Sequence, residues 1–142
     1  KGMRSKGNNE LHVTSTHYDD QIALDLVRGS QRTVAIHGCE GNESVAYIGG
    51  SDDRLIELIT ESLEDIGISV REAPHHISGT QENNIVNMTQ TQGGVQLELT
   101  AQLRKELFKN RKSSRKNREN KDNWDDLMYD FADAMKKAIE RA

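Results

Sequence analysis

Two residues within predicted strands, His37 and Glu98, have side chains that can take part in chemistry. The stretch 32–38 (RTVAIHG) holds a short apolar run rich in β-branched residues, typical of a buried strand in a parallel or mixed sheet. We expect this strand to end at His37, where open α/β sheets bind ligands, with Gly38 allowing a sharp turn. Glu98 lies between two leucines in a second predicted strand, 94–99 (GVQLEL). A buried carboxylate needs a cation, a proton or hydrogen bonds. The pattern therefore predicts that His37 and Glu98 share one site.

Each of these residues also has an ordinary structural interpretation. A histidine after a strand is often a hydrogen-bonded residue without a ligand, and a strand glutamate is often paired with a cation. The spacing of His37 and Glu40 (H-x-x-E) leaves another option open, a zinc site completed by His75 or His76. Cys39 is interpreted as a plain loop cysteine, because no base is paired with it in the sequence.

Composition predicts a single α/β domain over residues 11–142, preceded by a tail or loop at 1–10. The chain has 142 residues, is 34% hydrophobic and carries a net charge of −4, which disfavours general nucleic-acid binding. A single cysteine excludes an internal disulfide framework. No apolar run approaches the roughly 18 residues of a membrane span, and no secretory h-region is visible.

Hydrophobic periodicity and capping residues predict the order of the elements. Strands are expected at 11–16, 33–36, 45–48, 68–72 and 94–99. Helices are expected over 19–29, 52–66, 100–108 and 124–139, with a helical turn near 82–88 and polar loops at 74–81 and 110–121. Such alternation favours a largely parallel sheet.

Several stretches resemble the phage-type poly-γ-glutamate hydrolases. They are LHVTSTHYDD at 11–20, IHG at 36–38, IGG at 48–50, NNIVN at 83–87 and GVQLELTAQLR at 94–104. The resemblance covers about residues 11–140 and implies a three-layer α/β/α zinc-peptidase-like fold, similar to carboxypeptidases. It also implies a zinc-dependent hydrolase that cuts the γ-glutamyl amide bonds of poly-γ-glutamate, a bacterial capsule polymer.

The same resemblance assigns roles to the two strand residues. His37 matches a zinc ligand of the family, and Glu98 matches its catalytic glutamate. A catalytic zinc keeps an open position for water and lowers the pKa of that water to about 7, and a neighbouring carboxylate accepts its proton. Two further ligands are expected on a glycine-rich His…Glu segment upstream, which KGMRSKGNNE does not match. The chain is therefore expected to be the C-terminal portion of a longer domain or a partner of a missing N-terminal segment.

Substrate contacts are expected from polar residues in the matching blocks. His12, Thr14 and His17 belong to the most specific block, and their other interpretation is a strand edge and helix cap. Asn87 and Gln96 are weaker candidates for holding a substrate carboxylate. Met88 stands where the family usually has arginine.

The stretch 109–121 carries seven cations and one glutamate, which suits a polyanionic partner. Besides the zinc hydrolase, two other functions therefore stay open. One is a polyanion-binding remnant of the same fold without metal. The other is a phage nucleic-acid-binding protein that uses this basic stretch.

Overall fold

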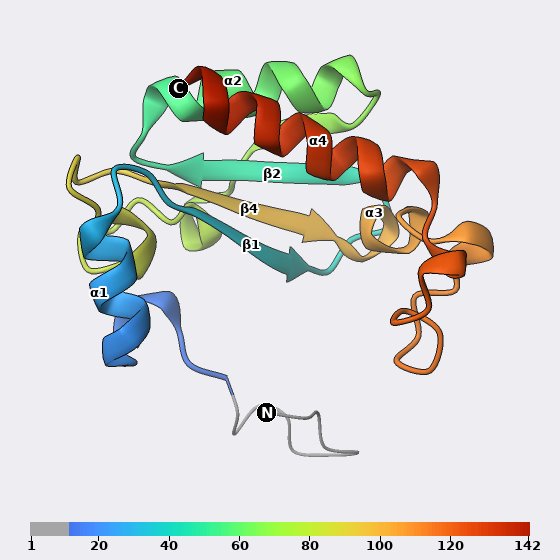
Figure 1. Cartoon of the computed structure of the whole chain (residues 1–142), viewed down its shortest axis with the longest axis horizontal. Helices are drawn as coiled ribbons and strands as arrows, with labels where there is room; N and C mark the ends of the chain where they lie inside the picture. Colours follow the sequence, from blue (N-terminus) through green and yellow to red (C-terminus); the bar gives the residue numbers. More distant parts are fainter. Residues whose placement is uncertain (1–11) are drawn as a thin grey trace.

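The computed structural model describes residues 12–142, which form a four-stranded mixed sheet (Figure 1). The strands are β1 (Val34–Cys39), β2 (Val45–Gly50), β3 (Ser69–Glu72) and β4 (Val95–Thr100), in the order β1-β4-β2-β3. The β1–β4 and β2–β3 pairs are parallel, whereas β2 and β4 are antiparallel. The predicted α/β class with a mixed, largely parallel sheet is confirmed.

Four α-helices begin at residues whose side chains cap the first turn. They are α1 (Gln21–Gly29), α2 (Asp53–Asp65), α3 (Ala101–Glu106) and α4 (Asp126–Arg141). The caps Asp20, Asp52, Thr100 and Asp125 each accept a hydrogen bond from a backbone N–H two or three residues on. The predicted helices are therefore confirmed. None of the helices in the described part of the chain is long and apolar enough to cross a membrane.

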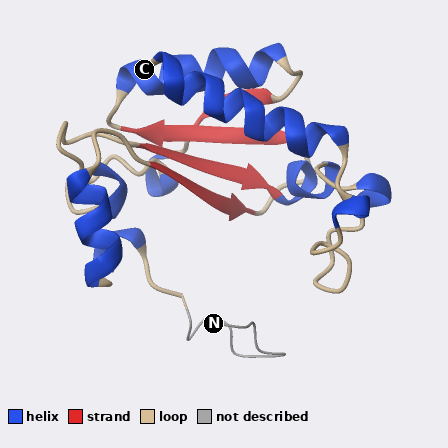
Figure 2. Cartoon of the chain, viewed as in Figure 1, coloured by secondary structure: helices blue, strands red, loops and turns tan. Residues whose placement is uncertain are grey.

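Helices α2 and α4 lie side by side over one face of the sheet (Figures 1 and 2). Successive side chains of a strand point to opposite faces, so Val95, Leu97 and Leu99 of β4 face these helices and join the buried core. Glu98 and Gln96 point to the other face and are also buried. This alternation separates the hydrophobic core from the polar residues of β4.

The other face is covered by the segment 74–93, which contains the 3-10 helices η3 (His75–Ile77) and η4 (Ile85–Asn87). Its backbone lies so close to β2 that a Cβ on Gly49 would be 2.1 Å from the carbonyl oxygen of Ser78. Helix α1 packs in turn against η4. Short helices and loops thus form the third layer.

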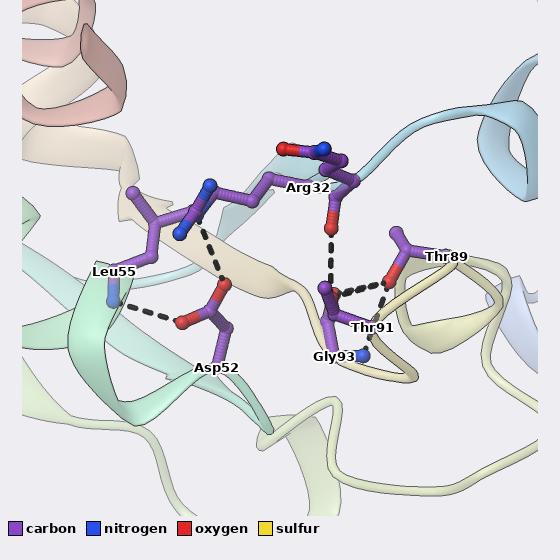
Figure 3. A network of polar contacts seen from close by, with 7 residues as sticks. Arg32, Asp52, Leu55, Thr89, Thr91 and Gly93 are labelled. Carbon is purple, nitrogen blue, oxygen red and sulfur yellow. Dashed lines mark hydrogen bonds and ion pairs between the residues drawn. The ribbon is translucent and has the colours of Figure 1, made fainter. Parts of the chain in front are cut away.

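A polar network joins the start of β1 to α2 and to the turn before β4 (Figure 3). Asp52 caps α2 through the N–H of Leu55 and lies 3.6 Å from Nε of Arg32. In the turn, Thr91 donates to the carbonyl of Gln31. These contacts set the amino ends of β1 and β4 beside each other.

Four local predictions were wrong. The described residues of the expected strand 11–16 form no strand, and η2 (Ser15–His17), a 3-10 helix, begins within them; residue 11 lies outside the described residues. Strand β1 continues past His37 to Cys39, so Cys39 is the last residue of a strand and not a loop cysteine, because it still pairs with Thr100 of β4. Gly38 therefore lies within the strand and not in a turn. Its lack of a side chain makes room for Arg104, as the site shows below.

Candidate functional site

The site is built on adjacent positions of two parallel strands. His37 of β1 and Glu98 of β4 are register partners, and paired strands lie about 4.8 Å apart. Partners in a parallel pair project from the same face, so both side chains point to the face opposite α2 and α4. The structure thus brings together the two residues that the sequence predicted to share a site.

Glu98 is 6% exposed. Burial raises the pKa of its carboxyl above the ordinary value, because desolvation disfavours the charged form. His37, the amide of Gln96 and Arg104 act in the opposite direction and lower this pKa. The carboxyl is therefore a buried acid–base group with a cationic and hydrogen-bonding environment.

Both residues line a depression of about 320 Å³, and most of the residues around it have polar side chains. Four of the predicted substrate-binding or neighbouring positions also line it, namely His12, Thr14, Thr16 and Gln96. Residues 12–16 form an extended segment and the start of η2 in place of the predicted strand. The side chains of His12, Thr14 and Thr16 nevertheless line the depression.

Two predicted substrate-binding residues lie elsewhere. His17 is exposed, and its Nδ1 lies 3.2 Å from Oγ1 of Thr14. Asn87 is buried in η4, where its amide donates to the carbonyls of Gly79 and Gln81 and accepts from Ser51. Asn87 therefore holds the covering segment to the sheet, and it borders a separate depression with Met88.

Two residues that line the depression, Gln81 and Asn84, were not among the predicted site residues, and a third, His76, was named only as a ligand of the alternative zinc site. They belong to the segment 74–93, whose polar composition predicted only a loop and a turn. The NNIVN block gave the one available signal, because it contains Asn84 and is part of the family resemblance. The alternative zinc site grouped His76 with His37, but nothing in the local pattern predicted η3, the element that brings His76 to this depression.

Arg104 of α3 joins the carboxyl ends of β1 and β4. Its Nε donates to the carbonyl of Leu99 and its Nη2 to the carbonyl of Cys39, at 3.2 and 3.0 Å. A Cβ on Gly38 would lie 2.8 Å from Cζ of this guanidinium. Glycine at 38 thus leaves free the space that the Arg104 guanidinium occupies next to the strand.

The alternative zinc site is not formed in the described chain. Among residues 12–142, no group of three or more His, Cys, Asp or Glu side chains is arranged to hold a metal ion. His37, Glu40 and His75 or His76 therefore do not make a self-contained site. Burial and the nearby Glu98 raise the pKa of the Cys39 thiol, which keeps this cysteine protonated and poorly nucleophilic.

Comparisons with known proteins agree with this fold. The family model for poly-gamma-glutamate hydrolase matches residues 1–134. The SPbeta prophage-derived protein YoqZ of Bacillus subtilis (strain 168) is 36% identical over 110 residues, which cover 76% of this chain. A bacteriophage poly-gamma-glutamate hydrolase structure superposes with a TM-score of 0.90 at 32% identity, and zinc-free YndL with a TM-score of 0.87 at 28%.

The matched proteins are longer than this chain. The chain spans 40% of the length of YoqZ. It covers 67% of the bacteriophage structure and 68% of YndL, while 99% of its own length is matched in both.

Proposed function

The chain belongs to the poly-γ-glutamate hydrolase family, and we propose that it forms the part of such an enzyme that carries the base for hydrolysis of γ-glutamyl amide bonds. The single observation that carries this proposal is the register pair of His37 and Glu98 at a polar depression. Burying a carboxylate in a strand costs free energy, and such groups are found where acid–base chemistry needs them. The position of Glu98 beside the imidazole of His37 is explained by such a role.

Glu98 acts as general base in this proposal. It accepts a proton from the attacking water, and the same carboxyl then delivers the proton to the nitrogen of the leaving amine. A rigid strand holds the carboxyl in place, and its raised pKa brings it closer to the pH at which proton transfer in both directions is efficient.

His37 is proposed as a zinc ligand, since a neutral imidazole is a common one. The described residues do not fit a complete zinc site, because a catalytic zinc needs three protein ligands and no such group occurs among residues 12–142. Two further ligands would have to come from outside the described residues.

The polar wall of the depression is proposed to bind the substrate. Poly-γ-glutamate carries a free carboxylate on every residue, and such carboxylates accept hydrogen bonds from hydroxyl and imidazole groups. Thr14, His12 and His76 present these donors beside Glu98. His17 and Asn87 lie away from the depression and would support substrate binding indirectly. His17 would do so by its contact with Thr14, and Asn87 by its hydrogen bonds within the covering segment.

The first test measures zinc content and polymer hydrolysis together on the wild-type chain and on His37→Ala. If the ligand set is complete, we expect elemental analysis to find about one zinc per wild-type chain and none in the variant. Hydrolysis by the wild type should then be abolished by EDTA. Zinc-free protein that hydrolyses poly-γ-glutamate only after a longer relative's remaining segment is added would support the incomplete-site form. Hydrolysis that persists in EDTA and in His37→Ala would contradict the role of His37.

A further inference from the structure

A chain of three hydrogen bonds links a backbone amide to the carboxylate of Glu98. The N–H of Val86 donates to Oδ1 of Asn84 at 3.1 Å. Nδ2 of Asn84 donates to Oε1 of Gln96 at 3.1 Å. Nε2 of Gln96 then donates to Oε1 of Glu98 at 3.3 Å. We refer to Asn84 and Gln96 as the amide relay.

The direction of the amide relay is determined at both of its ends. A backbone N–H can only donate, so the Val86 amide requires Oδ1 of Asn84 on its side and leaves Nδ2 to face Gln96. A backbone carbonyl can only accept, and that of Ile77 receives Nε2 of Gln96 at 3.1 Å. Gln96 must therefore present an N–H, and not its oxygen, to Glu98.

The relay is enclosed by the fold. Asn84 is 3% exposed and Gln96 is 6% exposed, so little water can replace a lost partner. Gly79 has a φ of +67° and leaves the space next to Gln96 free, because a Cβ there would lie 2.8 Å from Cβ of Gln96. The covering segment is thus shaped to the relay.

We propose that Asn84 and Gln96 are positioning residues for Glu98, holding its carboxyl in one orientation toward the depression. This inference rests on the proposed function in one respect, the use of Glu98 as the base. It gives Gln96 a different task from the predicted substrate contact, because Nε2 of Gln96 already donates to both Ile77 and Glu98.

The hydrogen bonds themselves can be tested without activity or metal. In a ¹H–¹⁵N spectrum of the whole chain, the side-chain NH₂ signals of Gln96 are assigned by their loss in Gln96→Leu. We expect Glu98→Ala to shift one of these two protons and to speed its exchange with solvent. Asn84→Ala should speed exchange of both by at least about tenfold, since the amide loses the partner that holds its oxygen.

The matched control is Asn123→Ala. Asn123 also holds a neighbouring segment by a side-chain hydrogen bond, to the carbonyl of Asn117, but lies in the separate helix η6 (Lys121–Asn123). It should leave the Gln96 signals unchanged. If Glu98→Ala leaves both Gln96 protons unmoved, or Asn84→Ala leaves their exchange unchanged, the amide relay does not exist in solution.

The consequence for catalysis is measured on the zinc-loaded enzyme. Misplacing the base should lower kcat on poly-γ-glutamate by roughly 10- to 100-fold in Gln96→Leu, with KM within about twofold of wild type. Asn84→Ala should lower kcat less, and it should have no further effect in the Gln96→Leu background, because Asn84 acts through Gln96. Gln21→Ala, which removes a side-chain amide hydrogen bond to Asp25 on helix α1, should leave kcat unchanged.

The outcomes separate the two proposals. A large rise in KM with unchanged kcat in Gln96→Leu would overturn positioning in favour of substrate binding. Additive effects of Asn84→Ala and Gln96→Leu would overturn the relay. A wild type without hydrolysis even after a longer relative's remaining segment is added would count against the proposed function, and the Gln96 signals would still decide whether the relay holds Glu98.

Discussion

At the residue scale, the site depends on the carboxylate of Glu98, whose burial costs free energy. Glu98 is surrounded by β4 and the covering segment, and the rise in its pKa that burial causes is opposed by His37, by one N–H of Gln96 and by Arg104. A second residue-scale feature is Gly38, whose lack of a side chain makes room for the Arg104 guanidinium and does not reflect an unusual backbone conformation.

Glu98→Gln should abolish most hydrolysis, by about 10²- to 10⁴-fold in kcat, because a carboxamide cannot accept a proton. The same change should stabilise the fold near neutral pH. The pKa of Glu98 is raised in the folded chain above the ordinary value of 4.5. The wild type therefore loses stability as pH rises through 4.5 toward the folded pKa, and the variant lacks this loss.

Urea unfolding at several pH values measures that difference. Wild type and Glu98→Gln should be closest in stability below pH 4.5 and should diverge above it. A variant with a circular dichroism spectrum like that of wild type and substantial remaining turnover would rule out Glu98 as the base.

Gly38→Ala should destabilise the chain by about 1–2 kcal/mol, because the new methyl group displaces the Arg104 side chain from the strand. In an Arg104→Ala background the same change should cost clearly less, since the displaced group is absent. Chemical unfolding of the four proteins of this cycle gives the coupling. Equal costs in both backgrounds would mean that Arg104 does not lie over Gly38.

At the element scale, capped helices and the segment 74–93 hold the strands in register. The cap of α2 also has a tertiary role, because Asp52 pairs with Arg32 just before β1 (Figure 3). Nε of Arg32 is buried and makes no hydrogen bond, so the ion pair with Asp52 offsets the cost of burying this polar atom.

Asp52→Ala should lower the free energy of unfolding by about 1–2 kcal/mol, through loss of the helix cap and of the charge facing Arg32. Asp52→Asn retains a capping oxygen and should lose less. Thermal and urea unfolding of both variants provide the comparison. Equal losses in the two variants would assign the whole effect to the charge.

The packing of the covering segment can be tested through Gly49. Gly49→Ala places a methyl group against the backbone of Ser78, which cannot rotate away, and should cost about 3 kcal/mol or expel the segment from the sheet. Gly29→Ala is the control, because a Cβ there meets no atom within 4 Å. Faster amide exchange of residues 74–93 in Gly49→Ala alone is the expected result.

At the whole-molecule scale, charge is distributed unevenly over a chain with net charge −4. The segment 109–123 lies beyond the carboxyl ends of β1 and β4 and is drawn in orange in Figure 1. Its cationic side chains are exposed, and Lys121 lies 5.5 Å from the ring centroid of Trp124. This end of the molecule therefore carries a row of exposed positive charges.

Lys112→Glu combined with Lys116→Glu should weaken binding of poly-γ-glutamate and make it less sensitive to salt, because fewer cations meet the polymer. Binding isotherms at two salt concentrations measure both effects. The double variant Lys136→Glu/Lys137→Glu, on α4, is the matched control for a change in net charge. Equal weakening by both pairs would assign the effect to net charge, and duplex DNA as a second ligand tests the nucleic-acid alternative.

Much of this protein follows from local sequence. The helices were predictable because apolar residues recur at helical spacing and because aspartate or threonine precedes each one. The β-branched run before His37 and the apolar residues around Glu98 likewise indicated buried strands. These features depend on neighbouring residues along the chain, so they are readable without a structure.

Tertiary structure alone decided how these elements meet. The register that sets His37 beside Glu98 depends on pairing between strands about sixty residues apart, and the amide relay depends on η4 lying over β4. The block at 12–16 alternates like a strand, but it finds no strand partner among the described residues and forms an extended segment and a 3-10 helix. Side-chain types and their candidate chemistry are local information, whereas register, burial and hydrogen-bond direction arise only when distant segments pack together.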